Sequence, residues 1–251
     1  ISFIIVNWNT RDILIDCLDS IYKTVTDIES EIYVVDNNST DGSRDAVKNG
    51  FPDVKLIANE TNTGFAHANN QALSVIQGRF AVLLNSDAVL QEGAINSLLN
   101  FMDNTPGAGI AGVQLLNEDG SRQNSIDNFP SLETEILNKS ILRLIFPNKY
   151  PGKAGNYNAP IEVDSVIGAC MMVRKEAMDA VGLLDEDYFI FLEETDWCFR
   201  MHKKGWKVYH VPDARVFHLS GHSKKKTPGE SQIEYYKSLY KFFRKNKDPV
   251  S

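Results

Sequence analysis

Residues 80–87 read FAVLLNSD, a continuous apolar run of five residues followed at once by three polar side chains. A short run of this kind is typical of a β-strand buried on both faces, because no position in it needs to face water. Ser2–Val6 and Glu31–Asp36 (EIYVVD) have the same design, and each is also followed by polar residues. The three runs predict strands whose polar ends lie at the ligand-binding edge of an open sheet.

Two further apolar runs are Val54–Ile57 and Gly109–Val113. Between the apolar runs, apolar residues recur at the spacing of a helix. The apolar positions that recur with this spacing are Leu14, Cys17, Leu18, Ile21, Val25, Phe65, Ala68, Ala72, Leu73, Ile76, Ile95, Leu98, Leu99 and Met102. Buried strands that alternate with amphipathic helices predict an α/β fold, in which helices flank a mostly parallel open sheet.

The second part of the chain is less regular. Residues 116–162 carry several prolines and one helical patch near Leu132–Ile145, and we interpret them as an insertion of the kind that forms lids and acceptor loops. Regular structure is expected again in the segment Val163–Arg174, which is followed by helices at Lys175–Val181 and at about 192–204. Strands near Lys207–Val211 and Arg215–His218 and a last helix at about 232–245 complete the chain.

Composition and charge exclude several classes of protein. The net charge of −7 argues against a nucleic-acid backbone as partner. Three separated cysteines, Cys17, Cys170 and Cys198, indicate reduced, buried thiols rather than a disulfide framework. No apolar run reaches the roughly 20 residues of a membrane span, and no signal peptide is visible, so we expect a cytoplasmic protein.

Two polar stretches are candidates for binding a nucleotide. Asp36 stands at the end of its strand, where a carboxylate can accept the imide N–H of uracil or thymine. A polar turn in which Asp41 or Ser43 caps a helix explains the same stretch equally well. Asn62-Thr63-Gly64 precedes the helix that begins at Phe65, and free amides at a helix N-terminus favour a diphosphate. A plain helix start is the alternative.

Asn85-Ser86-Asp87 is the candidate metal-binding turn. A carboxylate at a strand end, beside an amide and a hydroxyl, suits a hard divalent cation that bridges two phosphates. His218 follows another apolar run, Ala214–Phe217, and becomes a candidate ligand only in combination with such a turn.

Three acids lie close together at Glu193, Glu194 and Asp196, directly after the aromatic-rich run Tyr188–Leu192. Mutual repulsion and an apolar neighbourhood raise a carboxyl pKa, which is what a general base needs. A negatively charged helix N-terminus, stabilised by the helix dipole, is the alternative and accounts for one or two of the three acids.

Taken in order, six stretches of the chain resemble glycosyltransferase family 2, the inverting enzymes of GT-A fold. They are IIVNWNT, VVDNNSTDGS, NTGFAHANNQA, LLNSDAVL, GACMMVRKEAMDAVGLLDEDYFIFLEETDWCFR and VFHLSGHS, between Ser2 and Ser223. Within the family, the chain looks most like bacterial rhamnosyltransferases of cell-surface polysaccharide assembly.

The resemblance implies a role for each matched position. Asn7, Trp8 and Asp36 match the base pocket, with Asn38 beside them, and Asn62 and Gly64 match the donor-contacting turn. The metal motif corresponds to Asn85, Ser86 and Asp87, and His218 matches a further metal ligand. Glu194 matches the general base, with Glu193 and Asp196 beside it. Gly168 and Ala169 match a segment near the acceptor.

Two positions depart from the family pattern. Asn85 replaces the first acid of the family's D-x-D motif, and Glu194 replaces the usual aspartate. A single carboxylate, an imidazole and phosphate oxygens still suit Mn²⁺ or Mg²⁺. The two replacements keep a non-catalytic nucleotide-sugar-binding homologue open as the alternative.

The resemblance further implies a single domain over residues 1–251. We expect a nucleotide-sugar-binding half at 1–115, an acceptor-binding and catalytic half at 116–223, and a basic, aromatic C-terminal helix at 224–251. The expected donor is dTDP-rhamnose or else a UDP-sugar. The expected acceptor is a glycan or a lipid-linked saccharide.

Two other enzyme classes share an α/β nucleotide-binding half. A sugar-nucleotide pyrophosphorylase needs a Gly-rich N-terminal loop with Arg and Lys, whereas the corresponding stretch here is VNWNTRDI. A dinucleotide dehydrogenase needs G-x-G-x-x-G after its first strand, which is absent. Both are weaker alternatives.

The last helix mixes aromatic and basic residues: Tyr235, Tyr236, Leu239, Tyr240, Phe242 and Phe243 alternate with Lys237, Lys241, Arg244, Lys245 and Lys247. Such a helix either packs an aromatic stripe on the core and leaves a solvated basic face, or lies at a membrane surface. In the second case the protein contacts the inner face of the cell membrane peripherally.

Overall fold

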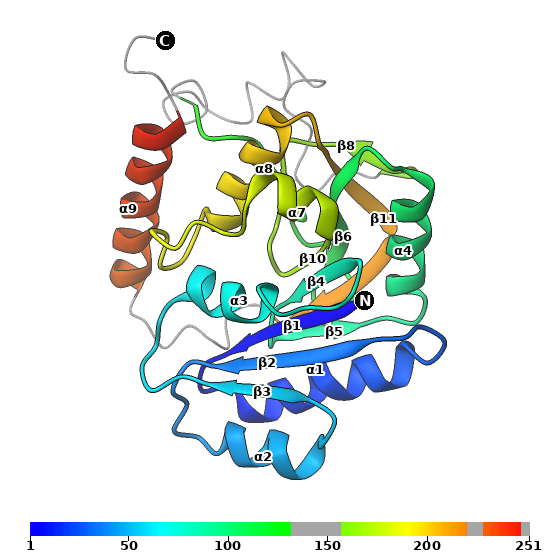
Figure 1. The fold of residues 1–251 in the computed structure, drawn as a ribbon, viewed down its shortest axis with the longest axis vertical. Helices are drawn as coiled ribbons and strands as arrows, with labels where there is room; N and C mark the ends of the chain where they lie inside the picture. Colours follow the sequence, from blue (N-terminus) through cyan, green and yellow to red (C-terminus); the bar gives the residue numbers. More distant parts are fainter. Residues whose placement is uncertain (132–156, 220–227, 247–251) are drawn as a thin grey trace.

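The computed structural model describes residues 1–131, 157–219 and 228–246 and shows one large mixed sheet between two layers of helices (Figure 1). The sheet has the order β3-β2-β1-β4-β10-β6-β11-β5, with β8 paired to β11. Its strands are β1 (Ser2–Asn7), β2 (Glu31–Asp36), β3 (Lys55–Ala58), β4 (Phe80–Leu84), β5 (Ala88–Leu90), β6 (Ala108–Leu116), β8 (Ile161–Glu162), β10 (Cys170–Arg174) and β11 (Lys207–His218). A small second sheet pairs β7 (Ile126–Asp127) with β9 (Ser165–Val166).

The direction of the strands changes in the middle of the sheet. Strands β3, β2, β1 and β4 run parallel to one another, and β6 runs parallel to β11. Between these groups β10 lies antiparallel to both β4 and β6. Antiparallel pairing places the beginning of β10 beside the end of β4, where residues 85–87 follow.

Helices cover both faces of the sheet, and alternate residues of β1 show the division. Phe3 and Ile5 pack with α1, α2 and α4, whereas Ile4 packs with α3, α7 and α8. The helices are α1 (Arg11–Thr24), α2 (Ser43–Gly50), α3 (Phe65–Leu73), α4 (Ala94–Asn104), α7 (Lys175–Val181), α8 (Glu193–Lys203) and α9 (Pro228–Asn246). The chain therefore has the predicted α/β architecture, a mostly parallel open sheet flanked by helices, with a C-terminal helix.

Several predicted boundaries are confirmed, and others differ for physical reasons. Strands at Glu31–Asp36 and Phe80–Leu84 and the helix at Lys175–Val181 have the expected bounds. The two strands expected near Lys207–Val211 and Arg215–His218 form one strand, β11, because a bulge between Val211 and Arg215 lets its pairing with β6 continue. The helical patch predicted at 132–145, and residues 224–227 and 247–251 of the predicted C-terminal part, lie outside the described residues.

The three cysteines are buried and free, as expected for reduced thiols. Within the described ranges, no helix combines the length and the apolar character that crossing a bilayer requires. Helix α9 lies at one side of the molecule, next to α8 and the segment that precedes it (Figure 1).

Candidate active site

The candidate residues converge on the edge of the sheet where β1, β2 and β4 end. Register pairs Asn7 of β1 with Asp36 of β2, so the two side chains that follow the apolar runs are neighbours. Asn7 Nδ2 donates to Asp36 Oδ2 at 2.9 Å. The parallel arrangement thus brings the first two candidate stretches together.

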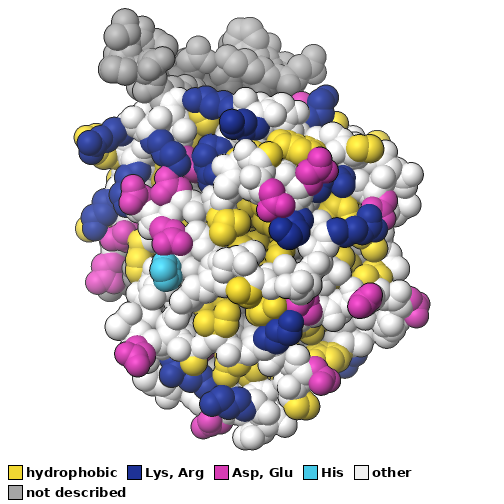
Figure 2. All heavy atoms as spheres, in the orientation of Figure 1, with side chains coloured by type: hydrophobic (Ala, Val, Ile, Leu, Met, Phe, Trp, Pro, Cys, Tyr) yellow, Lys and Arg dark blue, Asp and Glu magenta, His cyan; other side chains and the backbone are white. Residues whose placement is uncertain are grey.

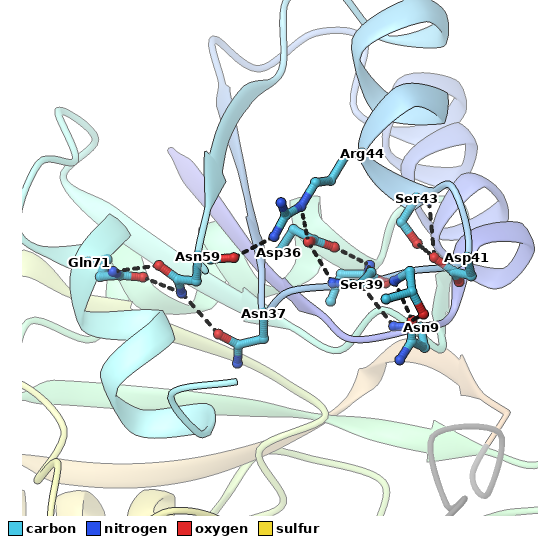
Figure 3. A network of polar contacts seen from close by, with 11 residues as sticks. Asn9, Asp36, Asn37, Ser39, Asp41, Ser43, Arg44, Asn59 and Gln71 are labelled. Carbon is cyan, nitrogen blue, oxygen red and sulfur yellow. Dashed lines mark hydrogen bonds and ion pairs between the residues drawn. The ribbon is translucent and has the colours of Figure 1, made fainter. Parts of the chain in front are cut away.

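Asp36 is held in a dense polar network (Figure 3). Its Oδ1 accepts the Ser39 amide at 3.0 Å and Arg44 Nε at 2.5 Å, and the carboxylate is 1% exposed. Burial alone would raise the pKa of Asp36, but the hydrogen bonds from Ser39, Arg44 and Asn7 outweigh it and hold that pKa below its ordinary value. Asp36 is therefore an anion whose hydrogen-bonding capacity is largely used by the protein itself.

The neighbouring turn at residues 62–64 is tied to the same network. Asn59 Nδ2 donates to both Asn37 Oδ1 and Gln71 Oε1 at 2.9 Å (Figure 3). Asn37 Nδ2 in turn donates to the Gly64 carbonyl at 3.1 Å. Gly64 has a φ of +86°, and a Cβ there would lie 2.6 Å from the Phe189 carbonyl oxygen. Only glycine fits at this position, because the backbone of the 185–192 segment approaches so closely.

The positions that the resemblance also assigned to the base pocket lie around this network. Trp8 follows β1 and is half-buried, and Asn38 is exposed with a φ of +63°. Asn62 Oδ1 accepts the Gly64 amide at 3.0 Å, which fixes the turn. Their contacts with a nucleotide remain predictions.

A chain of hydroxyl groups links this network to the candidate metal-binding turn. Thr10 Oγ1 donates to Asn7 Oδ1 at 2.6 Å and lies 3.0 Å from Ser86 Oγ. Ser86 and Asp87 are both buried, and Asn85 is partly buried. The stretches at 7–10, 36–39 and 85–87 are thus parts of one polar cluster.

Asp87 and His218 face each other because β5 pairs antiparallel with β11. The pairing sets Ala88 opposite His218, and the Leu219 amide donates to the Asp87 carbonyl at 2.9 Å. The side chains meet with His218 Nε2 3.3 Å from Asp87 Oδ1. The two predicted metal ligands are therefore adjacent.

The orientation of His218 fits a metal ligand. Gln123 donates its amide protons to Asn117 Oδ1 and to the His218 carbonyl, so that Gln123 Oε1 faces His218 Nδ1 at 2.7 Å. Because a carboxamide oxygen only accepts, Nδ1 carries a proton, and in the neutral ring the Nε2 lone pair points at Asp87. Two acceptors that face each other repel. A cation bound to both would remove this repulsion, and their separation suits such an ion because adjacent ligands of an octahedral ion lie about 3 Å apart.

The protein supplies only part of a metal shell. Within the described ranges no cluster of three or more His, Cys, Asp or Glu side chains has metal-binding geometry. Asp87 and His218 therefore fit a cation whose other ligands come from water and from a bound diphosphate, as Mg²⁺ and Mn²⁺ accept.

The acids of α8 reach the cluster through the start of β10. The Asn85 amide donates to the Ala169 carbonyl at 2.9 Å, and the preceding residue, Gly168, packs on Glu194. A Cβ at Gly168 would lie only 3.4 Å from Glu194 Cγ. One short backbone segment thus contacts both the metal-binding turn and Glu194.

Glu193 and Glu194 are electrostatically unusual. Burial raises the pKa of Glu194 to about 7, and the charge of Asp127 adds to this effect. Burial and the neighbouring Glu194 also raise the pKa of Glu193, and Glu193 Oε2 is buried without a hydrogen-bond partner among the described residues. A carboxyl group with such a pKa is able to take up a proton near neutral pH.

Asp196 has different surroundings from the two glutamates. Its carboxylate is fully buried and accepts hydrogen bonds from Arg200 Nε at 2.7 Å, Lys245 Nζ at 3.0 Å and Asn246 Nδ2 at 2.8 Å. The structure therefore brings Glu194 to the start of β10, keeps Glu193 buried beside it, and directs Asp196 towards α9.

Four residues in this region were not identified from the sequence. Gln123 orients His218, Asp127 acts on Glu194, Thr10 bridges Asn7 and Ser86, and Arg44 pairs with Asp36. Gln123 and Asp127 belong to the irregular 116–131 stretch, where no periodicity marks them. The bridging role of Thr10 depends on a tertiary contact with a residue on another strand end.

Comparison with known proteins places these features in a family context. The family model described as glycosyl transferase family 2 matches residues 2–182. The N-acetylglucosaminyl-diphospho-decaprenol L-rhamnosyltransferase of Mycobacterium tuberculosis is 29% identical over 228 residues, which cover 84% of this chain and 73% of the relative. The dTDP-rhamnosyl transferase RfbF of Shigella flexneri is 27% identical over 247 residues, covering 93% and 78%.

Two solved structures share the fold. The mannosyltransferase PcManGT of Pyrobaculum calidifontis, in complex with GDP-Man and Mn²⁺, has a TM-score of 0.66 at 20% identity and covers 99% of this chain. GalNAc-T7 with UDP, GalNAc and Mn²⁺ has a TM-score of 0.67 at 16% identity and covers 90%. The present chain spans 65% and 44% of these two chains, respectively.

The raised pKa of Glu194 predicts a pH-dependent effect on stability. Between the ordinary glutamate pKa of about 4.5 and the folded value of about 7, the folded protein binds more protons than the unfolded chain, so stability falls as pH rises. Glu194→Gln removes this penalty. Its free energy of unfolding should match the wild type at pH 4 and exceed it by on the order of 1–3 kcal/mol at pH 8 in urea denaturation.

Glu186→Gln is the matched control with the opposite sign. Hydrogen bonds from Asn70 and His67 lower the pKa of Glu186, so this variant should fall behind the wild type as pH rises towards the ordinary glutamate value of about 4.5, and the gap between them should stay constant from pH 5 to pH 8. A gap between wild type and Glu194→Gln that does not widen from pH 5 to pH 8 contradicts the assigned environment of Glu194.

Proposed function

Because the chain belongs to glycosyl transferase family 2 and is therefore a glycosyltransferase, we propose that it moves a sugar from a nucleotide diphosphate to an acceptor hydroxyl with inversion. The observation that carries this proposal is the contact of one backbone segment, Gly168–Ala169, with both Glu194 and the Asn85–Asp87 turn. In this proposal Glu194 is a proton acceptor that lies next to a site suited to a cation-bound diphosphate.

The proposed reaction is a single displacement. Glu194 accepts the proton of the acceptor hydroxyl, whose oxygen bonds to the anomeric carbon as the bond from that carbon to the diphosphate breaks. Burial raises the pKa of both Glu193 and Glu194, and the charge of Glu194 also raises that of Glu193, so the pair favours a state with one negative charge, which we assign to Glu194. Asn7, Asp36 and the 62–64 turn hold the nucleotide end of the donor.

Asp87 and His218 would hold Mn²⁺ or Mg²⁺, with Gln123 fixing the imidazole. The cation would supply a positive charge that stabilises the departing diphosphate. Asn85, which replaces the first acid of the usual motif, uses its backbone amide to bind Ala169 and so contributes to the position of the turn.

Glu194→Gln should lower kcat by about 10²–10⁴, because the amide keeps the shape of the side chain but takes up no proton. Donor binding, measured by calorimetry, should stay within the error of the wild type. Glu176→Gln, on the exposed side of α7, is the matched control. Wild-type turnover by Glu194→Gln would place the base elsewhere, and a wild type without turnover would favour the non-catalytic alternative.

Removing divalent cations with EDTA should abolish transfer, and Mn²⁺ should restore it. His218→Ala should raise the Mn²⁺ concentration for half-maximal activity at least about tenfold, the scale on which the second shell alone acts. His67→Ala, which removes an exposed imidazole paired with Glu186, should leave this requirement unchanged. Turnover that resists EDTA contradicts the metal site.

The proposal includes a donor and an acceptor. We propose dTDP-rhamnose as donor, with a UDP-sugar as the alternative, because two relatives are named as rhamnosyltransferases and one of these names specifies dTDP-rhamnose. We propose a cell-surface glycan or a lipid-linked saccharide as acceptor, because the mycobacterial relative is named for a decaprenol-linked acceptor. Family membership favours these reactions over that of a pyrophosphorylase.

We also propose that the outer face of α9 contacts an anionic lipid surface. Ile233, Tyr236 and Tyr240 are 56%, 57% and 67% exposed, and Lys237 and Arg244 lie on the same side of the helix. Figure 2 shows Lys and Arg side chains gathered at the upper left, over the C-terminal half of α9. Exposed tyrosines among cations suit a headgroup layer, even though the whole chain carries −7.

Lys237→Gln combined with Arg244→Gln should weaken binding to vesicles that contain phosphatidylglycerol by about 30-fold, at about 1 kcal/mol per cation. Lys23→Gln combined with Lys48→Gln removes the same charge from α1 and α2 and should have little effect. Sedimentation with phosphatidylcholine vesicles, with and without phosphatidylglycerol, measures this. No wild-type binding to the anionic vesicles would contradict the proposal.

A further inference from the structure

The segment that leads into the two glutamates has a strained backbone. Phe191 and Leu192 have φ values of +71° and +65°, and Glu193 begins α8 directly after them. A left-handed conformation is unfavourable for any residue with a large side chain, and two in succession persist only where the surroundings enforce them. Contacts outside this segment must therefore hold it.

Helix α9 supplies contacts along the whole segment. Ser238 Oγ donates to the Ile190 carbonyl at 2.9 Å, and Lys241 Nζ donates to the Asp187 carbonyl. The Tyr235 ring lies edge-on to Phe191, with 6.4 Å between the ring centroids. Successive turns of α9 thus bind successive residues of the segment between 187 and 191.

The last turn of α9 binds α8 itself. Lys245 and Asn246 of α9, together with Arg200 of α8, surround the buried carboxylate of Asp196, and we call these four residues the Asp196 cluster. Lys245 also pairs with Asp185, at the other end of the segment. Phe242 packs edge-on to Phe199 of α8 at 5.5 Å. Both ends of the 185–196 stretch are therefore tied to one lysine.

The same segment also contacts the turn proposed to bind the donor. The Phe65 amide donates to the Phe189 carbonyl at 2.8 Å, and Gly64 leaves no room for a side chain between them. A shift of the segment would thus displace the turn at 62–64 and the glutamates of α8 together.

We propose that α9 is a positioning element for the reaction, and that the Asp196 cluster fixes the first turn of α8 and thereby holds Glu194 at the start of β10. Asp196 and Lys245 are then positioning residues, since the Asp196 carboxylate is fully buried and binds Arg200, Lys245 and Asn246. The proposal rests on the function proposed for Glu194. It also extends the site to the last residues of α9, which the sequence placed in a separate part of the chain.

Lys245→Met tests the proposal, because methionine keeps the apolar stem and removes the charge that joins Asp185 to Asp196. We expect kcat to fall about 10–100-fold, since small displacements of a reacting group cost up to about 10²-fold. Lys245→Arg, which restores the charge, should recover most of kcat. Lys175→Met, which breaks an exposed pair with Asp179 on α7, is the matched control and should leave kcat unchanged.

Hydrogen exchange gives a readout that needs no activity. Amides of residues 189–196 should exchange faster in Lys245→Met than in wild type or Lys175→Met, while those of β1 and β4 stay protected. Exchange and kcat that both match the Lys175→Met control overturn the proposal. Wild-type kcat in Glu194→Gln would instead refute the function assigned to Glu194. The exchange rates of residues 189–196 would still test whether α9 holds this segment.

Discussion

The antiparallel pairing of β10 with β4 is the constraint on which the site depends. The chain leaves β4 at Asn85 and enters β10 after Ala169, and antiparallel pairing makes these two points neighbours. A parallel β10 would begin at the opposite edge of the sheet and would carry Gly168, and with it Glu194, away from Asp87. The reversal of one strand therefore joins a nucleotide-binding edge to an acidic helix from the second half of the chain.

The joined site keeps its carboxyl groups in different electrostatic states. Asp36 is surrounded by donors that stabilise its charge, whereas burial raises the pKa values of Glu193 and Glu194. Asp87 Oδ1 lies 3.3 Å from His218 Nε2, and the two are suited to share a cation. Local structure alone thus gives the site three kinds of carboxyl group. One is an anion that binds protein donors, one is an anion that shares a cation, and one is a group that takes up a proton.

Features set by local sequence were predictable, and features set by distant contacts were not. The continuous apolar runs at 31–36 and 80–84 fixed those strands, and the polar residues after them located the ligand-binding edge. Nothing local indicates that β10 runs antiparallel, that Gln123 orients His218, or that Lys245 reaches Asp196. The aromatic residues of α9 were expected to face either the core or a membrane; Phe242 is buried and Tyr240 is exposed.

A crystal structure of the protein soaked with Mn²⁺ and a thymidine or uridine diphosphate, with anomalous data at the manganese edge, is the most direct measurement. The account predicts one anomalous peak between Asp87 Oδ1 and His218 Nε2, in contact with the diphosphate and on the side that Glu194 faces. A peak elsewhere, or a Glu194 carboxylate turned away from the diphosphate, would contradict it.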